Sequence, residues 1–221
     1  MRAFLSPSMM CADIEKLSET LKTFGECGIE YLHVDVMDGC FAPNFTLGTD
    51  YVKKLRELTE IPLDAHLMIE RPEDKINWFA PRHGEFFSVH YESTPHVHRA
   101  LVKIKEAGAR PMLALNPHTP FRGIEHVLED IDAVLIMTVN PGYAGQKLID
   151  GTIKKIAGLR EWLDETGNER IEIEVDGNVS FANAARMREA GANIFVAGSS
   201  SVFDKNFSLR DAIKKLRDAV A

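Results

Sequence analysis

The chain is poor in cysteine and in long apolar runs. Its three cysteines, Cys11, Cys27 and Cys40, are odd in number and lack CxxC spacing, which argues against a disulfide framework and a thiolate zinc site. The longest apolar runs have the length of strands, so no transmembrane helix is expected, and the first residues lack the apolar core of a signal peptide. A formal net charge of −7 disfavours nucleic-acid binding, which needs a basic face. We therefore expect a cytoplasmic protein that binds neither a membrane nor nucleic acid.

Short apolar runs alternate with amphipathic segments along all 221 residues. This alternation is typical of a parallel sheet, and eight strand–helix units in this length predict an α/β fold, a single-domain (β/α)8 TIM barrel over residues 1–221. An open doubly wound sheet is the alternative. The expected strands are Ala3–Ser8, Tyr31–Met37, Leu63–Met68, Phe86–His90, Pro111–Leu115, Ala133–Val139, Ile171–Val175 and Ile194–Ala197. The expected helices lie near 13–27, 49–59, 72–82, 95–107, 120–129, 150–166, 180–190 and 207–219. Helix N-caps are expected at Asp13, Thr49 and Ser180, and C-caps at Gly108, Gly167 and Gly191.

The segment His33-Val34-Asp35-Val36-Met37 places a histidine and a carboxylate on one face of an expected strand. Alternate residues of a strand point to the same side, so His33, Asp35 and Met37 share that face. Burying an unpaired imidazole and carboxylate costs several kcal/mol. A bound metal ion would offset this cost, and so would a histidine–aspartate hydrogen bond in the core. The segment alone leaves both interpretations open.

The carboxyl ends of barrel strands, where active sites lie, carry further ligand residues. His66 and Asp176 end two other expected strands, so they join His33 and Asp35 at one end of the barrel. Imidazole and carboxylate ligands suit a borderline divalent ion, Zn, Fe(II) or Mn, with zinc as the first expectation. We therefore predict one divalent metal ion held by these four residues.

Two aspartates at one metal site also indicate acid–base chemistry. Asp35 and Asp176 lie on strands far apart in the chain, so they could flank a substrate from opposite sides, as inversion of a C–H stereocentre requires. The metal would hold the carbonyl and hydroxyl oxygens of the substrate and stabilise the enediolate formed on proton loss. No serine or cysteine triad, Walker motif or dinucleotide glycine motif points to another chemistry. One layer below, Glu174 is predicted to orient a ligand histidine, and Glu172 to lie near the solvated bottom of the barrel.

Three glycine-containing loops, Asn140–Gln146, Asp176–Asn178 and Ala197–Ser201, predict a phosphate site at the same end. The last two follow strands seven and eight, where barrels commonly bind phosphate with help from the N-terminus of a short helix. Residues Ser199–Phe203 are expected to form that helix. These loops contain no lysine or arginine, and Lys147 directly follows the first of them, so backbone N–H groups would carry most of the binding. The expected donors are Gly177, Gly198 and Ser199, with Gly142 and Gly145 closing the loop after strand six.

Motifs spread along the chain fit one pattern. They are Ser6-Pro7-Ser8, His33-Val34-Asp35-Val36-Met37-Asp38-Gly39, Phe41-Ala42-Pro43-Asn44, His66-Leu67-Met68, Met137-Thr138-Val139-Asn140-Pro141-Gly142, Glu174-Val175-Asp176-Gly177 and Val196-Ala197-Gly198-Ser199. Over the full length, this pattern resembles the ribulose-phosphate 3-epimerase family. The resemblance implies a metal-dependent isomerase that inverts C3 of a phosphoketose, D-ribulose 5-phosphate to D-xylulose 5-phosphate, with Asp35 and Asp176 as the two acid/bases. The substrate contacts expected from the resemblance and the loops are Ser8, His66, Met37, Met68, Met137, Gly142, Tyr143, Ala144, Gly145, Gly177, Asn178, Gly198 and Ser199.

Some positions depart from the commonest pattern of that family. Cys11 follows Met10 where a Leu-Ser pair is usual, and Ala144 and Asn178 each replace a glycine. Met10-Cys11 and Tyr143-Ala144-Gly145 are similar instead to the allulose-6-phosphate 3-epimerase branch, which acts on a six-carbon phosphoketose. A phosphate-binding barrel lyase would carry an Asp-x-Lys-x-x-Asp motif, but Met37 occupies the lysine position. A non-catalytic sugar-phosphate sensor should lack a ligand or proton carrier, and none is missing. We expect a small phosphorylated ketose as the partner and a homo-oligomeric state.

Overall fold

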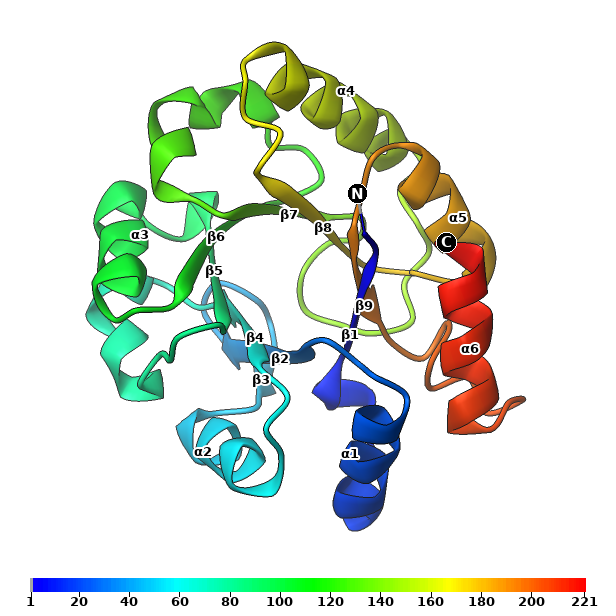
Figure 1. Cartoon of the computed structure of the whole chain (residues 1–221). Coiled ribbons are helices and arrows are strands. Elements are labelled where there is room, and N and C mark those ends of the chain that lie inside the picture. The colour runs from blue at the N-terminus through cyan, green and yellow to red at the C-terminus, as the bar shows by residue number, and fades with distance from the viewer. Residues whose placement is uncertain (1) are drawn as a thin grey trace.

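A curled parallel sheet forms the centre of the molecule, and helices surround it (Figure 1). The computed structural model describes residues 2–221. Neighbouring strands of the 9-stranded sheet follow the order β1-β9-β8-β7-β6-β5-β4-β2-β3, and each pair is parallel except β2 with β3. The strands are β1 (Phe4–Pro7), β2 (Leu32–Asp38), β3 (Phe45–Thr46), β4 (Leu63–Met68), β5 (Phe86–His90), β6 (Arg110–Leu115), β7 (Ala133–Met137), β8 (Glu172–Asp176) and β9 (Ile194–Ala197).

The sheet closes into a barrel between β1 and β2. Ser8, just after β1, forms a parallel bridge with His33 of β2, and the Tyr31 amide donates to the Leu5 carbonyl oxygen at 3.3 Å. The predicted (β/α)8 barrel is therefore confirmed, and the open doubly wound sheet is wrong. Because all eight long strands run in the same direction, their carboxyl ends meet at one mouth.

Six α-helices and several 3₁₀ segments cover the outside of the barrel. The α-helices are α1 (Leu17–Glu26), α2 (Thr49–Leu58), α3 (Val97–Glu106), α4 (Gly151–Glu165), α5 (Phe181–Glu189) and α6 (Leu209–Ala219). The 3₁₀ segments are η1 (Met9–Cys11), η2 (Ile14–Lys16), η3 (Pro72–Asp74), η4 (Ile76–Phe79), η5 (Tyr91–Ser93) and η6 (Phe121–Asp130). Among residues 2–221, no helix is both long and apolar enough to cross a bilayer.

The helix boundaries agree with the predictions in most places. The predicted C-caps Gly108, Gly167 and Gly191, all with positive φ, directly follow the C-caps of α3, α4 and α5, which are Ala107, Thr166 and Ala190. The expected helices near 72–82 and 120–129 are 3₁₀ segments, because their backbones make i→i+3 turns in place of α-helical bonds. The N-cap of α2 is Gly48 and not Thr49, which is already helical. Asp13 and Ser180 do accept capping hydrogen bonds, from the amides of Glu15 and Asn183. Strand β3 was not expected, since two residues carry no periodic pattern.

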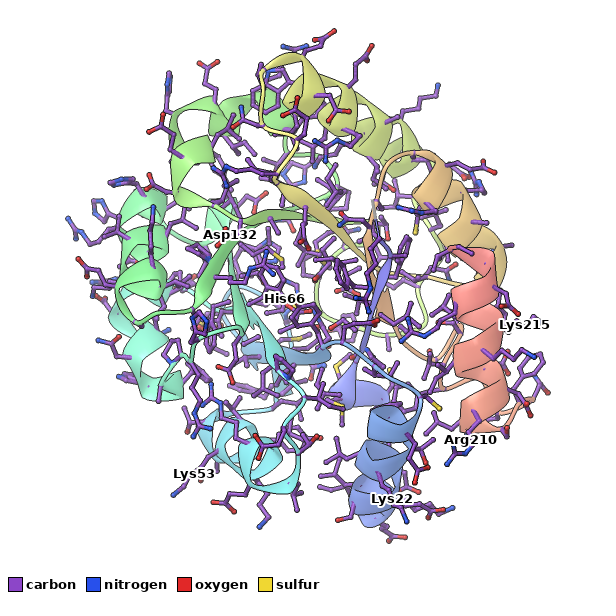
Figure 2. The ribbon with its side chains drawn as sticks, viewed as in Figure 1. Lys22, Lys53, His66, Asp132, Arg210 and Lys215 are labelled. Carbon is purple, nitrogen blue, oxygen red and sulfur yellow. The ribbon has the colours of Figure 1, made fainter. Side chains whose placement is uncertain are left out.

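Two apolar cores lie on the two sides of the sheet. The larger core fills the space between strands and helices, where α6, for example, buries Ala212, Ile213 and Leu216 along one face. The smaller core lies inside the barrel and contains Phe86, Met112, Ala114, Ala133, Leu135, Met137 and Ile194. Figure 2 shows the difference in direction: His66 lies within the ring of strands, whereas Lys22, Lys53 and Lys215 point outward from the helices.

The amino ends of the strands are closed by aromatic and charged side chains. The Arg110 guanidinium stacks over the Phe86 ring at 4.0 Å and donates to the Tyr31 hydroxyl at 3.1 Å. The ring of Tyr31 contacts those of Phe4 and Phe86. Glu172 pairs with Arg110 at 3.5 Å and is only 19 % exposed, so it is more enclosed than its predicted place at a solvated bottom suggests. These residues fill the barrel below the polar layer described next.

Candidate active site and metal centre

Two histidines and two aspartates meet inside the mouth of the barrel. His33 and Asp35 come from β2, His66 from β4 and Asp176 from the end of β8. Parallel pairing of β2 with β4 places Asp35 directly beside His66. One ligand atom from each of the four residues lies within 4.8 Å of the others. The predicted ligand set is therefore brought together by strand parity and register.

The chemistry of this cluster fits a metal ion. His66 Nδ1 lies 3.5 Å from Asp35 Oδ1 and 3.8 Å from Asp176 Oδ2, yet it is buried without a hydrogen-bond partner. His33 Nε2 lies 3.2 Å from the same Asp35 oxygen. A buried imidazole nitrogen without a partner beside two carboxylates is unfavourable unless a cation joins them. The donors, two nitrogens and two carboxylate oxygens, match those that divalent zinc, iron and manganese accept.

A layer of buried polar groups lies directly beneath the cluster. His33 Nδ1 hydrogen-bonds Asp64 Oδ2 at 2.6 Å, and Glu174 Oε1 lies 3.5 Å from the same nitrogen. The Ser6 hydroxyl donates to Asp64 at 2.9 Å. Asp64 and Ser6 are missing from the predicted site, although Asp64 shares the inward parity of His66 and so could have been recognised. Glu174 lies where the prediction placed it, but Asp64 makes the closer contact with the histidine.

The two carboxyls of Asp35 and Asp176 have opposite pKa shifts. Burial first, and then the neighbouring Asp35 carboxylate, raise the pKa of Asp176 to about 7. Burial also acts to raise the pKa of Asp35, but the adjacent His33 outweighs it and lowers that pKa. Ser8 donates to Asp35 Oδ2 at 2.7 Å. Asp35 is thus favoured as the ionised acceptor of the pair, while Asp176 holds a proton more readily.

His90 is a further histidine at the centre that was not predicted. It ends β5, and its Nε2 lies 2.8 Å from Nε2 of His66. Burial lowers the pKa of His90 to about 4, so it is neutral at physiological pH. The sequence indicated only that His90 ends an expected strand. Nothing in the local sequence shows whether such a histidine binds the metal or hydrogen-bonds to a ligand.

A cavity opens above the cluster toward solvent. It is lined by Ser8, Asp35 and Asp176 and by most of the expected substrate contacts. These are Met37, Met68, Met137, Gly142, Tyr143, Ala144, Gly145, Gly177, Asn178, Gly198 and Ser199. His66 is fully buried and does not line the cavity. Within the described chain, the lining includes no lysine or arginine, so an anion there would depend on backbone N–H groups.

The three glycine loops converge on this cavity, but one detail of the prediction is wrong. Residues Ser199–Phe203 form a hydrogen-bonded turn in which the Ser201 and Phe203 amides donate to the Gly198 carbonyl, so there is no short helix. Gly177 has φ +116°, and a Cβ there would lie 2.6 Å from Val139 Cγ2. Only glycine fits that position. The Gly198 position is different, because a Cβ would meet only the Cys11 sulfur, at 3.5 Å.

Two loops join across one side of the cavity. The Asn44 side chain donates to the Gly142 carbonyl oxygen at 3.0 Å, and the Tyr143 hydroxyl donates to that of Pro43 at the same distance. The Asn178 side chain donates to the Gln146 carbonyl at 2.7 Å. The loop after β7 is therefore held both by the loop after β2 and by the turn after β8.

The fold and the site together define a (β/α)8-barrel enzyme built around a cluster of two histidines and two aspartates. A model of the Ribulose-phosphate 3 epimerase family matches residues 4–203. The chain belongs to this family and is an isomerase. The curated ribulose-phosphate 3-epimerase of Bacillus subtilis is 46% identical over 196 residues, which cover 89% of this chain and 90% of that protein. That of Methanocaldococcus jannaschii is 39% identical over 215 residues, 97% of this chain and 90% of its own.

Solved structures with low sequence identity share the fold. KGPDC from Streptococcus mutans superposes with a TM-score of 0.69 at 14% identity and covers 100% of this chain and 98% of its own. A 3-hexulose-6-phosphate synthase from Salmonella typhimurium has a TM-score of 0.68 at 15% identity and covers 98% of each chain. At these identities the likeness concerns the barrel alone. The predicted family and fold class are therefore confirmed.

Proposed function

We propose that this enzyme inverts C3 of D-ribulose 5-phosphate to give D-xylulose 5-phosphate, using Asp35 and Asp176 as a pair of acid/bases. The observation that carries this proposal is the placement of two carboxyls from different strands in one cluster at the cavity floor. Two strands, β1 and β9, separate β2 from β8 around the closed barrel, so the two side chains reach the cavity from different directions. Inversion needs this arrangement, because the proton leaves one face of the carbon and arrives on the other.

In the proposed reaction, the ionised Asp35 takes the C3 proton and Asp176 donates a proton to the opposite face, with the roles exchanged in the reverse direction. Ser8 holds Asp35 by a hydrogen bond and so fixes the direction of its free lone pairs. His33, Asp35, His66 and Asp176 would hold one divalent ion, with zinc as the first expectation. When bound, the ion would stabilise the negative charge that develops on the oxygens of the substrate. Met37, Met68 and Met137 line the cavity beside the carboxyls and keep water from the reacting carbons.

The phosphate of the substrate is proposed to bind at the glycine loops that line the cavity. Gly198 and Ser199 follow β9, and Gly177 follows β8, with Gly142 and Gly145 in the loop after β7. A ketose that lacks the phosphate would lose this binding energy, which orients the reacting carbon.

A six-carbon substrate, D-allulose 6-phosphate, is the second candidate. The observation in its favour is that Met10, Cys11 and Ala144, which are similar to the allulose-6-phosphate branch, line the cavity. A barrel lyase that depends on a cavity lysine is disfavoured, because Met37 occupies the corresponding position and packs on Met68. The homo-oligomeric state stays a prediction.

Incubation with D-ribulose 5-phosphate in heavy water tests the reaction. We expect deuterium to enter at C3 while D-xylulose 5-phosphate forms, with no carbon–carbon cleavage, because the incoming proton comes from an acid that exchanges with solvent. NMR spectroscopy and mass spectrometry measure both. The ratio of kcat/KM for D-ribulose 5-phosphate and D-allulose 6-phosphate then ranks the two substrates. Cleavage products, or inversion without label from either ketose, would contradict the proposal.

Replacing Gly198 with valine tests the phosphate site. The added methyl groups project into the space assigned to the anion, and misplacement of a substrate by about 1 Å can cost roughly 10²-fold in rate. We expect kcat/KM for the phosphorylated ketose to fall by about that factor. Activity on the free ketose, which is low from the start, should change little.

Gly198→Ala is the matched control, because its Cβ makes only an ordinary contact with the Cys11 sulfur. Its kcat/KM should stay close to that of the wild type. Normal turnover of the phosphorylated ketose by Gly198→Val, or a preference of the wild type for free ketoses, would show that the anion binds elsewhere.

A further inference from the structure

The two ring nitrogens of His66 face different neighbours. Nδ1 faces the carboxylates of Asp35 and Asp176 and makes no hydrogen bond, whereas Nε2 lies 2.8 Å from Nε2 of His90. The two ring planes lie within 26° of each other, with centroids 5.0 Å apart. A nitrogen–nitrogen contact this short between nearly parallel rings is an edge-to-edge hydrogen bond. One of the two nitrogens must carry a proton and the other a lone pair.

Glu92 determines which nitrogen carries the proton. The carboxylate oxygen Oε2 lies 3.2 Å from His90 Nδ1, and Oε1 accepts from the Asn116 amide at 2.9 Å and from the Thr119 hydroxyl. An ionised carboxylate only accepts hydrogen bonds, so His90 must carry its proton on Nδ1. His66 turns Nδ1 toward the two aspartates of the metal centre, so it donates from Nε2, and Nε2 of His90 accepts. The lone pair of His66 is left on Nδ1, directed at the two aspartates.

The position of this hydrogen-bond chain shields it from water. His66 and His90 are both fully buried. The Phe41 ring packs against His90 with a centroid distance of 4.6 Å. Water therefore has no room to replace a lost partner. Glu92 sets the donor and acceptor of the bond with His90, and His90 in turn sets those of the bond with His66. The chain of hydrogen bonds runs from the loop after β6, through Glu92 of η5 and His90 at the end of β5, to His66 on β4.

The second ligand histidine is held in a different way. His33 donates from Nδ1 directly to Asp64, and Nε2 faces Asp35. Support by one carboxylate is the common arrangement for a histidine that binds a metal. For His66, a second histidine stands between the ligand and the carboxylate. The inserted histidine transmits the direction of the hydrogen bond with Glu92 to His66.

We propose that His90 and Glu92 are positioning residues that fix the tautomer of His66, with the Nδ1 lone pair available for the metal ion, and thereby increase the metal affinity of the site. This inference rests on the metal centre given under the proposed function. It assigns roles to two residues outside the ligand set, and neither lines the cavity.

Two substitutions of His90 test the inference through metal affinity. His90→Phe keeps an aromatic ring but removes the acceptor for His66. We expect the Kd for Co²⁺, measured by competition with a chromophoric chelator, to rise about 10–100-fold, as is typical when the hydrogen-bond partner of a ligand histidine is removed. His90→Gln should recover part of the affinity, because an amide can accept from His66 and donate to Glu92 at once. His118→Gln, on the exposed part of the loop after β6, is the control and should bind as the wild type does.

The positions of the protons give an independent measurement that needs no variant. In the wild-type protein loaded with Zn²⁺, imidazole ¹⁵N NMR shifts should show the proton of His66 on Nε2 and that of His90 on Nδ1. A proton on Nε2 of His90 would overturn the inference, as would a folded His90→Phe variant with wild-type Co²⁺ affinity. A wild-type chain that binds no divalent ion would overturn the proposed metal centre together with this inference. The two failures are thus distinguishable.

Discussion

Replacing Asp176 or Asp35 with asparagine is expected to lower kcat by about 10²–10⁴-fold, the usual contribution of a positioned general acid or base. An amide has nearly the same shape as a carboxyl but cannot give or take the proton. Coupled steady-state assays of both directions measure the loss. The metal content of each variant, measured by elemental analysis, separates the loss of a proton carrier from the loss of the ion, which would deepen the defect.

The two variants should differ in which epimer exchanges its C3 hydrogen with solvent. Two residues that only bound the metal or the substrate would not produce this difference. With one base left, each variant can still remove the C3 proton from one epimer and return it to the same face. Asp35→Asn and Asp176→Asn should therefore exchange the C3 hydrogen with heavy water in opposite epimers, without inversion. Asp150→Asn is the control, because Asp150 is 80% exposed and pairs only with Arg186 in the described chain. Near wild-type inversion by either variant with metal bound would show that the reaction does not use two bases.

Removal of divalent ions by a chelator is expected to abolish activity while the protein stays folded. The apolar cores inside the barrel and between its strands and helices do not depend on the ion, unlike the cores of small domains that fold only when metal binds. Circular dichroism and thermal unfolding should thus show a native barrel, with a lower Tm because a ligand of the folded state is missing. Activity should return with Zn²⁺, Mn²⁺ or Fe²⁺.

Calcium provides the matched control for this experiment. It prefers six to eight oxygen ligands, so a site with two imidazole nitrogens should bind it poorly and gain little activity. Full turnover by a preparation shown to be free of metal would contradict the proposed centre. Collapse of the fold on chelation would show instead that the ion is structural.

The ligand set could be predicted from the sequence because two simple rules of strand geometry determine it. Alternation along β2 places His33 and Asp35 on one face, and the carboxyl ends of parallel strands bring His66 and Asp176 to the same mouth. The strand Ile194–Ala197 has clear boundaries because its apolar run is continuous.

The residues around the ligands could not be predicted in the same way. Which side chain supports His66 depends on the register between β4 and β5 and on the path of the loop that places Glu92, and neither is encoded in a short pattern. The 3₁₀ segments η4 and η6 have helix-like apolar spacing, so their tighter turns are not visible in the sequence. The turn at Ser199–Phe203 failed as a helix because two of its amides donate to the single carbonyl of Gly198.

The barrel is closed at the amino ends of its strands by Arg110 and the rings of Tyr31 and Phe86. Within residues 2–221, the active centre therefore opens only on the side of the glycine loops. Product has to leave along the path by which substrate arrived, and solvent hydrogen that reaches an acid/base has to use that path as well. A bound sugar blocks it. The fraction of product that carries solvent hydrogen at C3 should then depend on how often the acid/bases exchange with solvent after one product leaves and before the next substrate binds. Label incorporation therefore reports on product release as well as on the chemical step.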